Sequence, residues 1–183
     1  IPIRTGDTLQ LKMNSNNRYE YYTRRNGAFK IAQNENDEKI IYSNDVRLIV
    51  RSTTDSLGKI LIEKKAEGSS FAAAKEKAVA INYNYTLENN VLMLDGYLTT
   101  DFENKYREQE VEVVVYLPEG SILIADENTY SYHRNYARYD DILNNGDEGQ
   151  YLRILEDKTE CLDCPIKDID PNEDTIEIED WEK

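Results

Sequence analysis

The chain has 183 residues, with 36 Asp or Glu against 22 Lys or Arg, so its formal net charge is −14. Phosphate backbones are bound by clustered basic residues, so we expect no nucleic-acid partner, and an acidic surface is also repelled by anionic lipid headgroups. No stretch approaches the roughly 20 apolar residues of a membrane-spanning helix. The chain begins at Ile1 rather than Met, and we interpret it as part of a longer protein that is tethered to a membrane by segments outside this chain.

Apolar residues mostly alternate along the first third of the chain, which predicts half-buried strands. Clear alternation occurs over 9–13, 19–21 and 29–31, and further strands are predicted over 40–42, 46–50 and 60–62. Asn26-Gly27 separates the second of these segments from the third, and this dipeptide is typical of a hairpin turn.

One helix is predicted over 71–80, where FAAAKEKAVA supplies good helix formers after a possible cap at Ser69 or Ser70. Phe71, Ala74 and Ala78 fall on one helical face. We therefore expect this face to pack closely against a sheet, with Phe71 as its buried anchor.

The second half of the chain returns to strand patterns. A hairpin is predicted around Asn89-Asn90, because both residues tolerate positive φ. The strongest strand, VEVVVYL at 111–117, ends at a turn of Pro118, Glu119 and Gly120. Further strands are predicted over 121–125 and 151–155, and the polar region 126–150 is predicted to form a long loop or an irregular edge. Val113 and its alternating neighbours in the strongest strand should be buried.

About ten strands and one short helix predict an all-β fold of mostly antiparallel strands, arranged as a sandwich, a barrel or a stacked solenoid. We divide the chain into a β-rich domain, 1–158, and an acidic C-terminal appendage, 159–183. The appendage contains two Cys residues and an Ile176, Ile178 alternation.

Few residues have the pattern of a catalytic or metal site. His133 is the one His, and we interpret it as an exposed or partly packed loop residue, because no nucleophile motif surrounds it. Acidic loops at 101–104, 139–141 and 146–149 lack the spacing of a calcium loop. We assign no catalytic, metal-binding or cofactor-binding residue, and we expect no enzyme activity.

Cys161 and Cys164 form the motif C-L-D-C. A redox-active pair, a zinc site, a disulfide and a reduced structural pair all remain open. Redox-active pairs normally lie at the N-terminus of a helix, which stabilises a thiolate. Here Pro165 follows in an acidic stretch, which disfavours a thiolate. Zinc needs two further ligands, and the chain has no other Cys. We favour a structural disulfide formed in an oxidising compartment.

Tyr is abundant, with 14 residues, and clusters at Tyr83/Tyr85 and at Tyr130/Tyr132/Tyr136/Tyr139. Such clusters can form a platform for sugars or peptides. Alternating Tyr residues are more often part of strand packing, since the ring packs while the hydroxyl remains hydrated.

The order of several segments resembles the ToastRack domain of phage-shock-protein-C-type bacterial membrane proteins. The matching stretches are VRLIVRST (46–53), ILIEKKAEGSSFAAAKEKA (60–78), INYNYTLENNVLMLDGYL (81–98), REQEVEVVVYLPEGSILIADENT (107–129) and ECLDC (160–164). The resemblance implies a solenoid-like stack of strands on the periplasmic side of the inner membrane, with a part in envelope-stress signalling. It implies no catalytic residues.

We therefore expect a non-catalytic extracytoplasmic interaction or sensing domain whose partner is an envelope or membrane protein. A glycan-binding or surface-binding, adhesin-like module is the alternative hypothesis. A hydrolase that uses two carboxylates is the third. A pocket with two close carboxylates would favour the hydrolase, and a shallow aromatic platform would favour the glycan-binding module.

Overall fold

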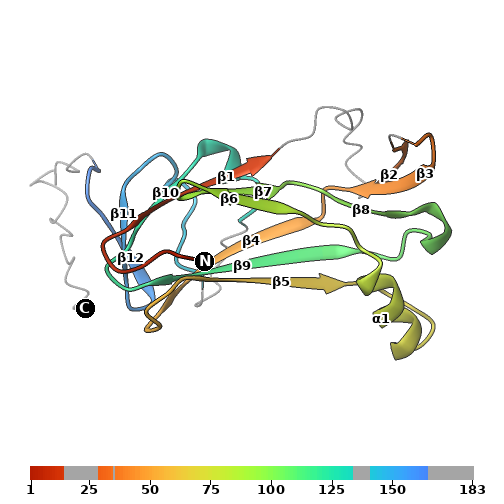
Figure 1. The fold of residues 1–183 in the computed structure, drawn as a ribbon, viewed down its shortest axis with the longest axis horizontal. Coiled ribbons are helices and arrows are strands. Elements are labelled where there is room, and N and C mark those ends of the chain that lie inside the picture. Colours follow the sequence, from red (N-terminus) through yellow and green to blue (C-terminus); the bar gives the residue numbers. More distant parts are fainter. Residues whose placement is uncertain (15–28, 35, 134–140, 165–183) are drawn as a thin grey trace, which may run out of the picture.

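A computed structural model describes residues 1–14, 29–34, 36–133 and 141–164. The described chain is an elongated assembly of strands with one short α-helix at one end (Figure 1). Its elements are β1 (Thr8–Asn14), β2 (Phe29–Gln33), β3 (Lys39–Ser43), β4 (Val46–Thr53), β5 (Lys59–Lys65), α1 (Phe71–Val79), β6 (Tyr85–Glu88), β7 (Val91–Asp95), β8 (Leu98–Asp101), η2 (Phe102–Asn104), β9 (Glu110–Pro118), β10 (Ile122–Ala125), η3 (Glu127–Thr129), β11 (Leu152–Leu155) and β12 (Lys158–Cys161).

The strands form three sheets. The largest has the order β12-β11-β10-β1-β7-β6, and the two others have the orders β2-β3-β8 and β4-β9-β5. Most neighbouring strands are antiparallel, but β1 runs parallel to both β7 and β10, and β4 runs parallel to β9. The prediction of an all-β fold with mostly antiparallel strands and one helix is confirmed.

One continuous hydrophobic core joins the six-stranded sheet to the sheet that contains β9. Leu9 and Leu11 of β1 and Leu92 and Leu94 of β7 enter it from one side and are fully buried. From the other side, β9 contributes the alternating residues that were predicted to be buried. These are Val111, Val113 and Val115, and all three are fully buried. The alternation of apolar residues in these strands directs them to the core, as expected from the strand period of two.

The opposite face of β9 is also largely covered. Val114 is 2% exposed, and the Glu112 carboxylate receives the Arg47 guanidinium at 3.5 Å and the Lys65 ammonium at 3.3 Å. A charge this deeply buried requires such partners, because an unpaired carboxylate loses its hydration without compensation. β9 is therefore a central strand buried on both faces.

Two predicted turns are confirmed. β6 and β7 form an antiparallel hairpin through Asn89 and Asn90, whose φ angles are 51° and 61°. The chain leaves β9 through a turn in which Gly120 has a φ of 80°. Asn tolerates this left-handed conformation better than most residues, and Gly adopts it without strain. The predicted turn at Asn26-Gly27 and the strand over 19–21 lie outside the described residues.

The helix begins where predicted, but the predicted burial of Phe71 is wrong. The Ser70 hydroxyl caps α1 by accepting a hydrogen bond from the Ala73 amide at 3.2 Å. Phe71 is 85% exposed, and no residue of α1 is buried. A short connection after the edge strand β5 places the helix at one end of the molecule (Figure 1), and the described residues leave Phe71 largely uncovered there.

The division predicted at 158/159 stays a prediction. β12 (Lys158–Cys161) pairs with β11 at the edge of the six-stranded sheet, and residues 165–183 lie outside the described residues. In the part of the chain that the structure describes, no helix is both long and apolar enough to cross a membrane.

The burial of β9 predicts a severe effect of Val113→Asp. The substitution would place an unpaired charge in the core, and we expect it to cost several kcal/mol and to prevent folding. Val79→Asp is the matched control, because Val79 is 72% exposed on α1, and we expect a change within about 1 kcal/mol. Urea denaturation followed by circular dichroism measures both. A Val113→Asp protein with a normal midpoint would contradict the assignment of β9 to the core.

The exposure of Phe71 predicts a near-neutral Phe71→Ala substitution. We expect the free energy of unfolding to change by no more than about 0.5 kcal/mol, as for most surface substitutions. Leu48→Ala, at a fully buried position, should cost about 2–5 kcal/mol in the same denaturation assay. Equal losses in the two variants would mean that Phe71 is packed.

Candidate interaction surface

One edge of the sheet that contains β9 is covered by the chain itself. The edge is β4, and the region between β10 and β11 supplies its partners. The Leu48 amide donates to the Tyr132 carbonyl at 2.9 Å, and the Ile142 amide donates to the Val50 carbonyl at 2.9 Å. The Val50 amide donates to an Asp141 carboxylate oxygen at 3.1 Å. The segment predicted as a polar loop therefore satisfies the edge of β4.

The other edge of this sheet is open. Within the described residues, β5 pairs only with β9, and β6, the edge of the six-stranded sheet, pairs only with β7. In Figure 1, β6 is drawn above β5, and both strands run along the length of the molecule. We call the core-facing apolar side chains of these two edge strands, Ile60, Ile62, Tyr85 and Leu87, the front seam. An open strand edge presents peptide N–H and C=O groups that can pair with another strand.

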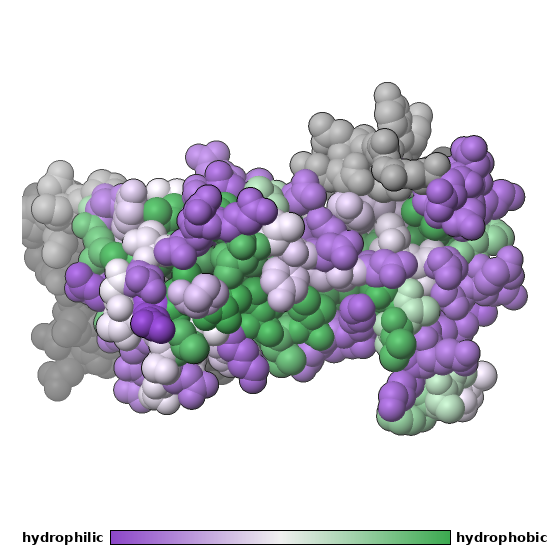
Figure 2. All heavy atoms as spheres, in the orientation of Figure 1, coloured by the Kyte–Doolittle hydropathy of each residue, from purple (hydrophilic) through white to green (hydrophobic). Residues whose placement is uncertain are grey.

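The front seam is apolar because the side chains of both edge strands point toward the core. Ile60 and Ile62 stand opposite Val115 and Val113 of β9, and both are half-buried against the core. Leu87 stands opposite Leu92 of β7 and is also half-buried. Figure 2 shows hydrophobic residues gathered on this face between the upper and lower strands.

Tyr85 extends the front seam outward. It stands opposite Leu94, so it lies on the core-facing side of β6, yet it is 43% exposed. The front seam thus combines an exposed aromatic ring, partly covered aliphatic side chains and two open strand edges. This combination fits a polypeptide better than a small molecule.

Both ends of the front seam are closed. At the start of β5, the Ile1 ammonium donates to the Gly58 carbonyl and the Gly58 amide donates to the Ile3 carbonyl, both at 2.8 Å. At the far end, the Lys64 ammonium reaches across to the Ile81 carbonyl at 2.7 Å. The open edge is therefore limited to β5 itself, from Lys59 onward.

The charge of β5 differs from that of the whole chain. Its sequence KILIEKK has three Lys residues and one Glu, whereas the chain has a net charge of −14. Lys65 pairs with Glu110 at 3.6 Å as well as with Glu112. The Lys59 ammonium lies 5.6 Å from the centre of the Tyr116 ring, within the range of a cation–π contact. β5 is a basic edge strand on an acidic protein.

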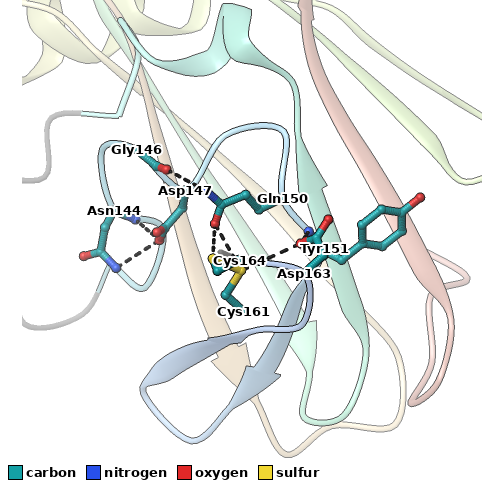
Figure 3. Close-up of a disulfide and its surroundings, with 8 residues drawn as sticks. All are labelled: Asn144, Gly146, Asp147, Gln150, Tyr151, Cys161, Asp163 and Cys164. Atoms are coloured by element: carbon teal, nitrogen blue, oxygen red, sulfur yellow. Dashed lines mark hydrogen bonds between the residues drawn. A yellow bond between two sulfur atoms is a disulfide. The ribbon is translucent and has the colours of Figure 1, made fainter. Parts of the chain in front are cut away.

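The two Cys residues lie away from the front seam, at the end of the six-stranded sheet. Their sulfur atoms are at disulfide-bonding distance, and their Cα atoms are 5.7 Å apart. Cys161 ends β12 and is half-buried, whereas Cys164 is exposed. The Gln150 side-chain oxygen contacts both sulfur atoms (Figure 3). The structural role predicted for this pair stays a prediction.

The turn closed by the two Cys residues also holds the start of β11. The Tyr151 amide donates to an Asp163 carboxylate oxygen at 2.9 Å (Figure 3). The Leu162 amide donates to the Tyr151 carbonyl at 2.8 Å. A bridge between Cys161 and Cys164 keeps Asp163 in position for the first of these bonds. Its physical effect is therefore local to the β11–β12 edge.

The prediction that His133 is an exposed or partly packed loop residue is wrong. Its side chain is fully buried, with Nε2 2.6 Å from a carboxylate oxygen of Glu148, whose side chain is 8% exposed. The other Glu148 oxygen accepts the Gly146 amide at 2.8 Å. Sequence reasoning missed this contact because 15 positions separate the two residues and only the folded loop brings them together.

Another buried polar cluster lies where β1 and β7 end. Asn14 donates to the Asp95 carboxylate at 3.0 Å, and burial raises the pKa of Asp95. Burial also raises the pKa of Tyr83, whose hydroxyl has no hydrogen-bond partner among the described residues. No sequence pattern marks this cluster, because Asn14 of β1 lies 81 positions before Asp95 of β7.

The described members of the predicted Tyr clusters do not form a shared platform. Tyr83 is 9% exposed, whereas Tyr85 is 43% exposed, so the pair does not form a flat platform. Tyr130 is exposed and Tyr132 is half-buried, while Tyr136 and Tyr139 lie outside the described residues. Among the described residues, no group of three or more His, Cys, Asp or Glu side chains is placed to hold a metal ion.

Comparison with known proteins gives one match. A family model described as ToastRack found in some PspC matches residues 32–167 of the chain. No curated protein and no solved structure matches. The matched region includes the front seam, the covered edge of β4 and both Cys residues.

We predict that Cys161 and Cys164 are bonded to each other in protein matured outside the cytoplasm. The closed loop is short, so the bond should contribute about 2 kcal/mol or less in the chain-entropy model, and reduction should loosen 156–183 with little effect on the core. Thiol trapping with mass spectrometry, and hydrogen exchange before and after reduction, measure this. The Cys161→Ser, Cys164→Ser double variant is the control. Two free thiols in the extracted protein, or tightly bound zinc, would contradict the prediction.

Proposed function

Because the chain belongs to the ToastRack family found in some PspC proteins, we propose that it is a non-catalytic interaction and sensing domain on the outer side of a bacterial inner membrane. ToastRack is a non-catalytic domain family. In this proposal the domain binds an envelope or membrane protein, and membrane segments outside this chain relay the result in an envelope-stress response.

The open front seam is the observation that most supports this function. The fold covers the edge of β4 with its own loop, but it leaves β5 and β6 uncovered within the described residues. Open edges invite pairing with other chains, so natural proteins commonly cover or charge them. The edge of β5 is charged by its Lys residues, but the half-buried Ile60, Ile62 and Leu87 form apolar surface beside the two open edges of an otherwise strongly charged protein, which is typical of a binding surface.

The front seam also suggests how binding would occur. A partner segment in an extended conformation can pair with the peptide groups of an edge strand while its side chains enter the apolar strip. This mode of recognition needs no pocket and no catalytic group. It fits a surface of half-buried Ile60, Ile62 and Leu87 better than it fits a glycan, for which exposed aromatic rings would be the main contacts.

A site-specific cross-linking experiment tests the proposed function. A photoreactive phenylalanine analogue at Tyr85 would lie on the front seam, and the same analogue at Tyr151 is the matched control. The two Tyr residues are similarly exposed, at 43% and 46%, but Tyr151 lies beside the disulfide at the opposite sheet edge (Figure 3). The membrane-anchored protein would be irradiated in living cells, with and without envelope stress.

We expect a discrete protein adduct from position 85, localised to the cell envelope, whose yield changes with stress. Position 151 should give no such adduct. Equal adducts at both positions, or adducts of position 85 with polysaccharide only, would contradict the proposal. A cytoplasmic location of the domain would contradict it as well.

A further inference from the structure

We propose that residues 173–179 of a second copy of this chain add to the open edge of β5 as an antiparallel strand. This inference rests on the proposed function, because it takes the front seam as the interaction surface and names one occupant of it. Residues 173–179 have the sequence EDTIEIE and lie outside the described residues. The argument uses their sequence, the structure of β5 and the reach of the chain.

The outer edge of β5 has no strand partner among the described residues, although α1 contacts β5. Ile1 and Ile3 form hydrogen bonds with the backbone of Gly58, the residue just before β5, and these bonds do not extend into β5. From Lys59 to Lys65, β5 pairs only with β9 in the part of the chain that the structure describes. Seven residues are therefore available for pairing with a strand of similar length.

The side chains of β5 specify what such a strand should contain. On the core-facing side, Ile60 and Ile62 are half-buried beside Val115 and Val113, so the added strand should place apolar residues next to them. At the ends of β5, Lys59, Lys64 and Lys65 are exposed, so acidic residues should stand there, in addition to the contacts that Lys64 makes with the Ile81 carbonyl and Lys65 makes with Glu110 and Glu112. Cross-strand pairs of opposite charge stabilise a sheet, and like charges directly opposite destabilise it.

The segment 173–179 meets these requirements in a single antiparallel register. Ile176 and Ile178 then stand opposite Ile62 and Ile60. The acidic residues fall opposite the basic ones, as Glu173 with Lys65, Asp174 with Lys64 and Glu179 with Lys59. The two remaining pairs, Thr175 with Glu63 and Glu177 with Leu61, oppose no like charges.

The parallel arrangement is less favourable. If Ile176 and Ile178 stand opposite Ile60 and Ile62 in the parallel direction, Glu179 falls opposite Glu63. Lys59 then faces Thr175, and Lys65 faces Trp181, so two of the three charge pairs are lost. The antiparallel register is therefore the one that the charges favour.

The strand is assigned to a second copy because residues 165–172, which connect Cys164 to Glu173, are too few for the chain's own segment to reach this position. The antiparallel register places Glu173 beside Lys65, at the end of β5 next to α1, whereas β12 and Cys164 lie at the opposite end of the molecule (Figure 1). The eight residues 165–172 span at most roughly 30 Å when extended, which is about the length of the nine-residue β9 alone. Lys65 stands opposite Glu110 at the start of β9, whereas the Gly120 amide, just beyond the end of β9, donates to the Ile154 carbonyl of β11, the neighbour of β12. The segment would therefore have to run the whole length of β9 and also cross from β12. A second copy supplies the strand without this limit, and reciprocal exchange gives a closed dimer.

Sedimentation equilibrium of the full chain tests the proposal with two charge reversals. Lys59→Glu gives β5 an acidic residue opposite Glu179, and Glu179→Lys gives the added strand a basic residue opposite Lys59. Either variant alone should dimerise about tenfold more weakly, because both exchanged strands then have like charges in opposition. Lys75→Glu, on the exposed side of α1, and Glu182→Lys, outside the register, are the matched controls and should dimerise like the parent chain.

Mixing the two variants distinguishes the second copy from the chain's own C-terminal segment. In an equimolar mixture, each variant's β5 meets the complementary strand of the other, so we expect dimers of parental strength. The chain carrying both substitutions should also regain dimerisation. The proposal would be overturned if the parent chain is monomeric at all concentrations. It would also be overturned if neither charge reversal weakens dimerisation.

A further outcome would assign the strand to the same molecule. If the doubly substituted chain restores hydrogen-exchange protection of β5 while its mass stays that of a monomer, the second copy is excluded. The proposed function fails separately, by cross-links from Tyr85 that reach no envelope protein. A monomeric chain that still gives such cross-links would overturn only the present inference.

Discussion

The structure depends on the burial of β9 on both of its faces. One face presents Val111, Val113 and Val115 to the core shared with the six-stranded sheet. The other face buries Val114 and pairs the Glu112 carboxylate with Arg47 and Lys65. A strand in this position needs a neighbour on each side, and β4 and β5 serve as those neighbours, one parallel and one antiparallel.

The outer edges of β4 and β5, the two neighbours of β9, differ in whether other parts of the chain form hydrogen bonds with them. The proposed function rests on this difference. The region between β10 and β11 supplies hydrogen-bond partners along β4. β5 has no such cover within the described residues, and together with β6 it borders an apolar strip. Since an uncovered edge is a liability for an isolated protein, this difference supports the proposal that a partner strand pairs with β5.

Sequence patterns predicted the strands well because burial follows an alternation that is visible in the sequence. The fully buried Leu9 and Leu11 of β1 and Val113 of β9 are examples. The same patterns did not predict which strands become neighbours. β1 pairs in parallel with β7 and β10, and parallel neighbours are joined by long crossovers that leave no local trace in the sequence.

The errors at Phe71 and His133 have the same origin. Helical spacing identifies which face of α1 is apolar, but the burial of Phe71 depends on what packs against it, and the described residues leave it exposed. The burial of His133 depends on Glu148, which reaches it only through the folded loop. The front seam is likewise beyond prediction from local patterns, because its residues come from β5 and β6, which are edge strands of two different sheets.

Hydrogen exchange of single amides, followed by NMR on the dilute free protein, tests the central claim most directly. The account predicts that amides of β9 exchange slowest and that the outward-facing amides of β5 exchange at nearly the rate of unpaired peptide groups. Protection should be high along β4, whose edge is covered. If the outward amides of β5 are as protected as those of β9 in the dilute monomer, the edge is not open, and the account of the front seam as a binding surface is contradicted.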